Sequence, residues 1–135
     1  MPSKKPTYKK PREAIEYYEE CTWVGNDIPM FQNEKVSVFY DRYPVSKGHL
    51  LFVPKKNDVE HVSEAYKLAF YCGQEWIKES KMDGFNIGQN IGIAAGQSIM
   101  WPHVHFIPRH KGDSKEGQHN GIRLSHPNGD HKNYY

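Results

Sequence analysis

Residues 96–109 constrain the fold of this 135-residue chain more than any other segment, because their histidines alternate with apolar residues at the spacing of a β-strand. Successive side chains on a strand point to opposite faces, so His103 and His105 share one face. Val104 and Phe106 then point into a core on the other face. Two imidazoles on one face, beside the backbone amides and hydroxyl of a glycine-bearing turn, indicate a phosphate site.

The length and composition are those of one globular domain. The chain is 37% hydrophobic and 25% charged, and no apolar run approaches the roughly 20 residues that cross a bilayer. We therefore expect a soluble protein with no membrane contact. No apolar stretch follows the first lysines, so we expect no secretory signal and a cytoplasmic location. Free thiols at Cys21 and Cys72 fit that compartment.

The net charge of +2 conceals an uneven distribution. Five basic residues precede the first acidic one, Glu13: Lys4, Lys5, Lys9, Lys10 and Arg12. We expect residues 1–12 to form a basic, flexible arm before a single domain over residues 13–135. Such an arm is either a solvated leader or a contact for nucleic acid or another polyanion, and we favour the leader.

Apolar periodicity predicts one long helix and several strands. From residue 58 to residue 77, apolar side chains recur every three or four residues, as on an amphipathic helix. An early proline and early acidic residues indicate a second, short helix over residues 11–22. Runs rich in β-branched, aromatic and leucine residues predict strands at residues 36–40, 50–53, 85–91 and 99–107. The polar composition from about residue 110 predicts an irregular tail, with a short strand at residues 122–124 as the alternative.

Residues 96–109 resemble the signature of the histidine triad (HIT) family of nucleotide hydrolases and transferases. Residues 41–55 are similar to the family's stretch of aspartate, proline, glycine-histidine and proline-lysine, and residues 84–90 resemble the strand before its catalytic turn. The resemblance spans about residues 27–135. It implies an α+β fold, with an antiparallel sheet of about five strands, a long helix packed on one face and a short N-terminal helix. Relatives commonly form homodimers, for which the sheet edge or the long helix would be the contact.

The family motif is His-x-His-x-His, and an ungapped comparison places Trp101 at its first histidine. His103 and His105 then hold the second and third positions. By position, the resemblance makes His103 the nucleophile that attacks the α-phosphate and carries the nucleotide until water or another acceptor removes it. An imidazole suits that role because it is neutral near pH 7, and because two successive displacements have lower barriers than one.

The resemblance also implies roles for the groups around the nucleophile. His105 would donate to a non-bridging phosphate oxygen, because charge that develops during phosphoryl transfer needs positioned donors. Gln97 and Ser98, with their backbone N–H groups, would hold the phosphate and the leaving group. His49 would support the orientation of the nucleophile from behind.

On the nucleotide side, the resemblance implies a further set of contacts. Asp41 would accept the ribose hydroxyls, although a carboxylate just before Pro44 can also serve only as a turn cap. Asn90 would brace the nucleotide or its phosphates. Phe39 or Phe31 would wall the base.

Two functions remain open because an indole has one N–H donor and no acceptor, unlike the imidazole that Trp101 replaces. If the first motif histidine mainly buttresses the strand, the chain is a nucleotidyl hydrolase or transferase acting on dinucleoside polyphosphates or nucleoside phosphoramidates. If that histidine tunes the nucleophile, the chain is a nucleotide-binding or regulatory protein with weakened turnover. We expect the enzyme, because His103, His105, Gln97 and Ser98 are retained.

A zinc site is the rival explanation for paired histidines, since zinc takes about four ligands from cysteine, histidine and carboxylate. Some relatives hold zinc through a Cys-x-x-Cys near the N-terminus together with histidines. Here Val24 follows Cys21 at that spacing, Asn57 stands where a histidine often follows Pro-Lys-Lys, and Trp101 removes another ligand. We therefore predict no structural zinc. The phosphoryl chemistry requires no cofactor, although Mg²⁺ can arrive with the substrate.

Overall fold

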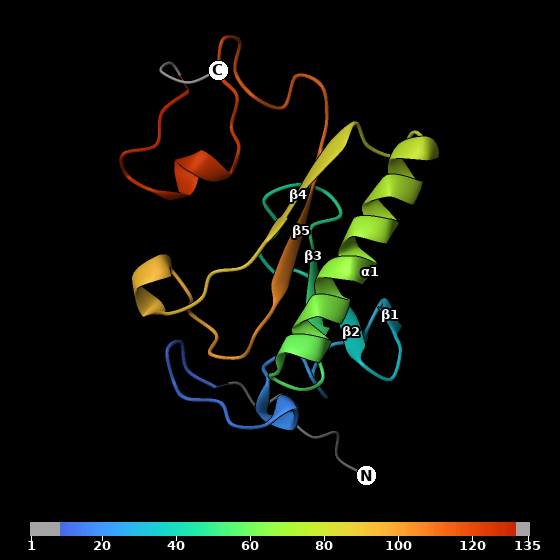
Figure 1. Ribbon diagram of the computed structural model, residues 1–135, viewed down its shortest axis with the longest axis vertical. Coiled ribbons are helices and arrows are strands. Elements are labelled where there is room, and N and C mark those ends of the chain that lie inside the picture. Colours follow the sequence, from blue (N-terminus) through green and yellow to red (C-terminus); the bar gives the residue numbers. More distant parts are fainter. Residues whose placement is uncertain (1–8, 132–135) are drawn as a thin grey trace.

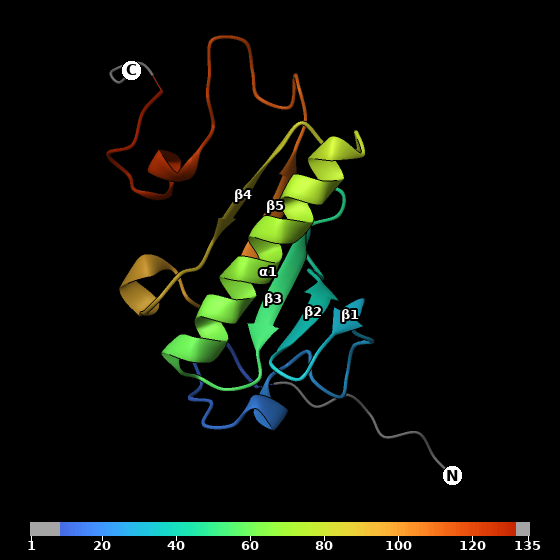
Figure 2. The ribbon, with the colours of Figure 1, turned by 45° about the vertical axis from the view of Figure 1, so that its right-hand side comes forward.

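The computed structural model describes residues 9–131 (Figure 1). Within this range five strands form one antiparallel sheet in the order β1-β2-β3-β5-β4. Their bounds are β1 Phe31–Gln32, β2 Val36–Tyr40, β3 Leu50–Pro54, β4 Gly84–Gly88 and β5 Val104–Arg109. A 20-residue helix, α1, spans Val59–Lys78 and lies across one face of the sheet (Figure 2). The α+β fold with one long helix on a five-stranded sheet is thus confirmed.

The main core lies between α1 and the sheet. Alternate residues of β2, β3 and β5 point toward the helix and are at most 2% exposed: Val36, Val38, Leu50, Phe52, Val104 and Phe106. The helix lies close to them because three of its four buried residues are small and four positions apart, namely Ala65, Ala69 and Gly73. Its first turn is capped by Asp58, whose carboxylate accepts the His61 N–H at 2.8 Å.

A second apolar cluster covers the opposite face of the sheet, at the end where β3 finishes and α1 begins. It joins strand residues to the N-terminal segment and to the turn before β5, and it consists of Cys21, Trp23, Phe39, Leu51, Val53 and Trp101. The indole N–H of Trp101 donates to the Pro54 carbonyl at 2.9 Å, which satisfies its one polar group. All five residues of β3 are buried as a result, because both faces of the strand are covered.

The N-terminal segment differs from its prediction. Only Tyr18–Glu20 form a helical turn, of the 3₁₀ type, where the sequence predicts a helix over residues 11–22. The reason is a long-range contact: Ala14 forms a parallel β-bridge with Met100, so the backbone there bonds to another segment instead of to its own next turn. Residues 1–8 of the expected basic arm lie outside the described residues.

Two strands are shorter than their predictions. β5 begins at Val104 rather than at residue 99, because Pro102 has no N–H to give to the ladder. β4 ends at Gly88 rather than at residue 91, and the chain then leaves the sheet for a 3₁₀ turn at Ile93–Ala95.

The tail after β5 is irregular as predicted (Figure 1). A 3₁₀ turn at Ile122–Ser125 stands where a short strand is the alternative expectation. Arg109 anchors the tail to the sheet, because its guanidinium donates to the Asp113 carboxylate at 3.0 Å and to Asn86 Oδ1 at 2.8 Å. In the part of the chain that the structure describes, no helix has both the length and the apolar character needed to cross a membrane.

Candidate active site

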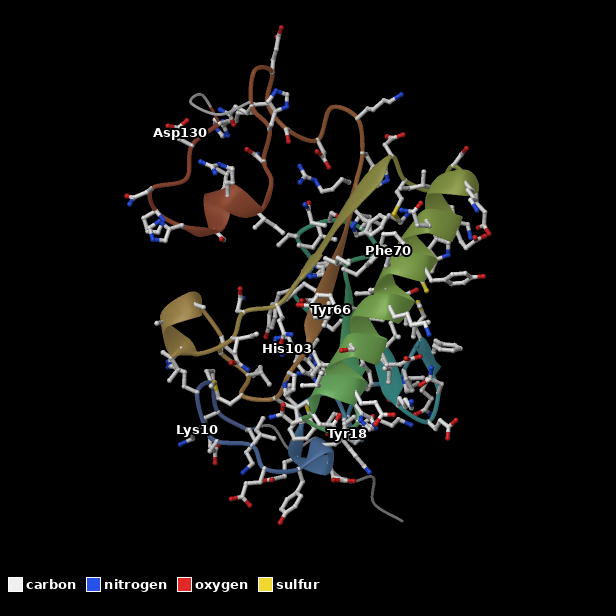
Figure 3. All side chains as sticks on the ribbon, in the orientation of Figure 1. Lys10, Tyr18, Tyr66, Phe70, His103 and Asp130 are labelled. Atoms are coloured by element: carbon white, nitrogen blue, oxygen red, sulfur yellow. The ribbon has the colours of Figure 1, made fainter. Side chains whose placement is uncertain are left out.

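The two motif histidines lie on the sheet face that α1 leaves open. His105 belongs to β5 and is paired with Leu51 of β3 and Gly88 of β4. His103 directly precedes the strand, and Figure 3 shows its side chain well inside the molecule. The centroids of the two imidazole rings are 5.2 Å apart. The chain therefore presents two adjacent imidazoles where its alternation pattern predicts them.

His103 is held in one tautomer. Its Nδ1 lies 2.7 Å from the carbonyl oxygen of Trp101, and because a carbonyl only accepts, the ring hydrogen must be on Nδ1. The lone pair of the neutral ring is then on Nε2. Trp23 packs against the ring with centroids 4.9 Å apart, and His103 is only 7% exposed. Burial lowers the pKa of His103, which keeps the ring neutral and Nε2 nucleophilic near pH 7.

A series of two hydrogen bonds, through His49, sets the tautomer of His105. The backbone N–H of Val45 donates to His49 Nδ1 at 3.1 Å, so His49 carries its hydrogen on Nε2. That Nε2 lies 3.0 Å from His105 Nδ1, which therefore accepts and leaves the His105 hydrogen on Nε2. The same Nε2 of His49 lies 3.3 Å from Asp41 Oδ2. His105 is thereby equipped as a donor toward a phosphate oxygen.

The three histidines of the site share one cause that lowers their pKa, which is burial. Burial is the largest cause that lowers the pKa of His49, and the nearby Asp41 carboxylate opposes it. Burial also lowers the pKa of His105, with a further contribution from His49, against the same opposition from Asp41. The contact of His49 is with His105, so any support it gives to His103 passes through the intervening ring.

Gln97 and Ser98 lie in the turn that leads to the histidines. The Gln97 side chain accepts the Gly92 N–H at 2.8 Å and donates to the Ile99 carbonyl at 3.1 Å, so it shapes the turn. The carbonyl of Ser98 accepts the Arg12 N–H at 2.6 Å, which ties the N-terminal segment to the same turn. The turn itself depends on glycine, because Gly92 and Gly96 have φ values of 90° and 91°.

A cavity of about 360 Å³ opens beside the second histidine. His49, His105 and Asn90 line it together with apolar residues that include Val45 and Ile122. Phe39 is only 2% exposed and lies in the second apolar cluster, beneath the surface of the site. Phe31 is 48% exposed on β1, the strand at the opposite edge of the sheet from β4. The structure therefore brings Asn90 to the histidines but not Phe31.

Within residues 9–131, one group of side chains could hold a metal ion by distance. Ligand atoms of Asp41, His49 and His105 lie within 4.8 Å of one another. A histidine that binds a metal through Nε2 carries its hydrogen on Nδ1, yet His49 Nδ1 already faces the N–H of Val45. The two hydrogens would oppose each other, so these groups fit a hydrogen-bonded chain better than a metal site.

The residues at the zinc positions of some relatives do not fit zinc either. Cys21 and Trp101 lie together in the second apolar cluster, and Val24 packs against it. Burial raises the pKa of Cys21 to about 12, whereas zinc binds the thiolate.

Three contributors to the site are not apparent from the sequence. Trp23 covers the His103 ring, the Trp101 carbonyl holds its Nδ1, and the Val45 N–H orients His49. Two of these are backbone groups, which every residue type offers in some form, so no residue pattern could have indicated them. Trp23 is an isolated aromatic residue, and only the long-range packing of the N-terminal segment gives it a role.

The fold is an antiparallel sheet covered by one long helix, and the paired histidines lie at the start of β5. These features define a small α+β domain with a histidine-based site. Residues 26–112 match the HIT domain, and the chain belongs to that family. It is 35% identical over 104 residues to an uncharacterised HIT-like protein of Methanocaldococcus jannaschii, covering 70% of this chain and 81% of that protein. It is also 32% identical over 107 residues to an adenosine 5′-monophosphoramidase of Saccharomyces cerevisiae, with 72% and 64% covered.

Solved structures agree with the family membership. A HIT-like protein involved in cell-cycle regulation from Bartonella henselae superposes with a TM-score of 0.62 at 25% identity, covering 73% of this chain and 83% of that one. The relatives include the yeast phosphoramidase and a protein of Arabidopsis thaliana named as an adenylylsulfatase, which supports nucleotide hydrolysis as the activity at the level of the family.

Proposed function

We propose that this chain is a nucleotidyl hydrolase or transferase that cleaves nucleoside phosphates at the α-phosphate through a nucleotide held covalently on His103. Dinucleoside polyphosphates and nucleoside phosphoramidates are the two substrate classes. One observation carries the proposal: the Trp101 carbonyl holds the Nδ1 hydrogen of His103, which leaves the Nε2 lone pair available in a buried, neutral ring.

In the first step, His103 Nε2 attacks the α-phosphorus and the bond from phosphorus to the leaving group breaks. Nδ1 keeps its hydrogen, which donates to the Trp101 carbonyl, so that oxygen stabilises the positive charge that the ring gains. Negative charge spreads over the phosphate oxygens, where the Nε2–H of His105 and the backbone N–H of Ser98 donate. The Gln97 N–H donates to the Gly92 carbonyl at 3.2 Å and holds the turn in shape. The leaving group departs with the electron pair of the broken bond and takes a proton from water.

In the second step, water attacks the phosphorus and loses a proton to the solvent while the bond to His103 Nε2 breaks. This step releases a nucleoside monophosphate and restores the neutral imidazole. A different acceptor makes the same step a transfer. Neither step requires a cofactor, and Mg²⁺ accompanies a polyphosphate substrate. Asp41, 14% exposed at its side chain, accepts the ribose hydroxyls, and Asn90 braces the phosphates beside His105.

The position of Trp101 favours the enzyme over a binding protein with weakened turnover. Its side chain points into the second apolar cluster, while its carbonyl contacts the nucleophile. The residue that replaces the first motif histidine therefore acts on His103 through a backbone group that both residue types possess.

A homodimer belongs to the same proposal. β4 is an outer strand of the sheet, and the outer side of α1 carries the exposed Phe70 and Tyr71, so either surface offers a contact for a second copy. Nucleic acid contact through residues 1–12 remains the less favoured alternative.

The experiment is an assay of nucleoside monophosphate release from diadenosine polyphosphates and adenosine 5′-phosphoramidate. We expect turnover by the wild type, a loss of roughly 1,000-fold or more in His103→Ala, and an acid-labile nucleotide adduct on the wild-type protein alone. His110→Ala, at an exposed histidine of the tail, is the matched control and should retain full activity. Turnover that survives in His103→Ala would refute the nucleophile. A folded wild type that binds mononucleotide without releasing product would instead identify a binding protein.

A further inference from the structure

His49 has one hydrogen to offer and two acceptors that face it. Its Nδ1 is occupied by the Val45 N–H, so the neutral ring donates through Nε2 alone. That nitrogen lies 3.0 Å from His105 Nδ1 and 3.3 Å from Asp41 Oδ2. The two acceptor atoms are 3.8 Å apart, so they stand side by side before the same N–H. The hydrogen bond runs to His105, and the Asp41 carboxylate attracts the same N–H through its charge.

The competition between these acceptors depends on what else the carboxylate binds. Asp41 Oδ1 accepts the Tyr43 N–H at 2.7 Å, while its side chain keeps 14% of its surface exposed. A charged carboxylate attracts a donor more strongly than a neutral imidazole does. Hydroxyl groups that donate to Asp41 from outside would satisfy part of its charge and so weaken its hold on the His49 hydrogen.

We propose that Asp41 couples recognition of the ribose to the donor strength of His105, with His49 as the positioning residue between them. A cis-diol bound at Asp41 reduces the attraction of the carboxylate for the His49 Nε2–H and so strengthens the hydrogen bond from His49 to His105. An imidazole that accepts a stronger hydrogen bond at Nδ1 becomes a stronger donor at Nε2–H, where the phosphate oxygen gains charge. No proton is transferred; only the strength of the hydrogen bond between His49 and His105 changes. The proposal rests on the proposed function and makes the site selective for ribonucleotides in turnover as well as in binding.

The kinetic test compares adenosine 5′-phosphoramidate with its 2′,3′-dideoxy form. For the wild type we expect KM to rise and kcat to fall about tenfold without the diol. This fall in kcat is smaller than the roughly 100-fold loss expected when a whole donor is removed. A carboxylate that only binds ribose would change KM and leave kcat equal for the two sugars, and that outcome would overturn the proposal.

Two variants remove the competition in different ways. His49→Gln places an amide with two hydrogens near the position of Nε2, one for each acceptor, so the ratio of kcat values for the two sugars should approach one. Asp41→Asn removes the competing negative charge, so KM for the ribose substrate should rise while the same kcat ratio also approaches one. Glu60→Gln, at a surface carboxylate paired with Lys35, is the control that should keep the wild-type ratio. A tenfold ratio that persists in both site variants would overturn the coupling.

A readout without turnover uses the imidazole nitrogens directly. In ¹⁵N spectra of histidine-labelled protein, saturating adenosine 5′-monophosphate should shift the resonances of His49 Nε2 and His105 Nδ1. Saturating 2′,3′-dideoxyadenosine 5′-monophosphate should leave them close to those of the free protein. Equal shifts with both nucleotides overturn the coupling while His103-dependent turnover still upholds the proposed function. Absence of any His103-dependent product release overturns the function, and the coupling falls with it.

Discussion

At His103, one backbone oxygen determines which nitrogen can act as a nucleophile. The Trp101 carbonyl holds the hydrogen on Nδ1, and this bond does not depend on the side chain at position 101. The indole points away into the second apolar cluster and donates to the Pro54 carbonyl. The unusual residue in the motif therefore belongs to the packing of the molecule, while the tautomer of the nucleophile is set by the backbone.

Trp101→His separates these two roles. We expect the free energy of unfolding to fall by roughly 2–4 kcal/mol, because a smaller polar ring underfills an apolar cluster. The value of kcat should stay within about threefold of the wild type, since the carbonyl remains in place. Urea unfolding and steady-state kinetics measure the two effects. Trp101→Phe retains an apolar ring and should lose only about 1–2 kcal/mol. A hundredfold change in kcat at unchanged stability would show that the side chain itself tunes the nucleophile.

The three histidines of the site predict a pH dependence with a definite sign. Burial lowers the pKa of His49, His103 and His105, so they gain protons only below their ordinary value of about 6.5. A protonated His103 has no lone pair, so kcat/KM should stay level down to pH 6.5 and decline in more acidic solution. Unfolded histidines already take up protons near pH 6.5, so the free energy of unfolding should also decrease as the pH falls below that value. A pH series of kcat/KM and of urea midpoints tests both, and an acid decline that begins above pH 7 contradicts the assignment.

At the scale of elements, the sequence predicts those segments in which apolar residues recur at the spacing of the buried side of a strand or a helix. β2 was predicted at its observed bounds and α1 from its capping residue, because strand and helix bury their apolar sides against each other. Residues 11–22 were misjudged because Ala14 bonds to Met100, far along the chain. The candidate histidines were predictable from side-chain types at strand spacing. Their tautomers were not, because these depend on backbone groups that come from other segments.

Gly73 tests how closely α1 packs on the sheet. A Cβ at this position would lie 2.4 Å from the Phe85 ring, which itself stacks on Phe106 in the core. Alanine favours a helix over glycine by about 1 kcal/mol, yet we expect Gly73→Ala to lose about 1–3 kcal/mol of stability, because overpacking outweighs propensity. Gln74→Ala, at the exposed neighbouring position, should be neutral or slightly stabilising. Urea unfolding compares the two, and a Gly73→Ala protein as stable as the wild type would mean that Phe85 moves aside freely.

At the scale of the whole molecule, the ends of the described chain complete a site whose center lies in the sheet. The HIT domain match covers residues 26–112, yet Trp23 precedes it and packs on His103. Ile122 and Ser125 follow it and line the cavity beside His105. The sheet and α1 fix the positions of the histidines, and the flanking segments determine how far solvent reaches them. Properties that depend on burial, above all the pKa of the nucleophile, therefore belong to the molecule as a whole.

Trp23 provides the most direct test of that dependence. Burial is the largest cause that lowers the pKa of His103, and Trp23 supplies part of it from the N-terminal segment. Trp23→Ala should raise the pKa of His103 toward its ordinary value, so the acid decline of kcat/KM moves to higher pH. Trp23→Phe retains an aromatic cover and should keep the wild-type profile. The alanine variant should also lose roughly 3–5 kcal/mol of stability, so Trp23→Leu, which fills more of the space, extends the series to a protein that stays folded. An acid decline at the same pH in every folded variant would assign the burial of His103 to the sheet alone.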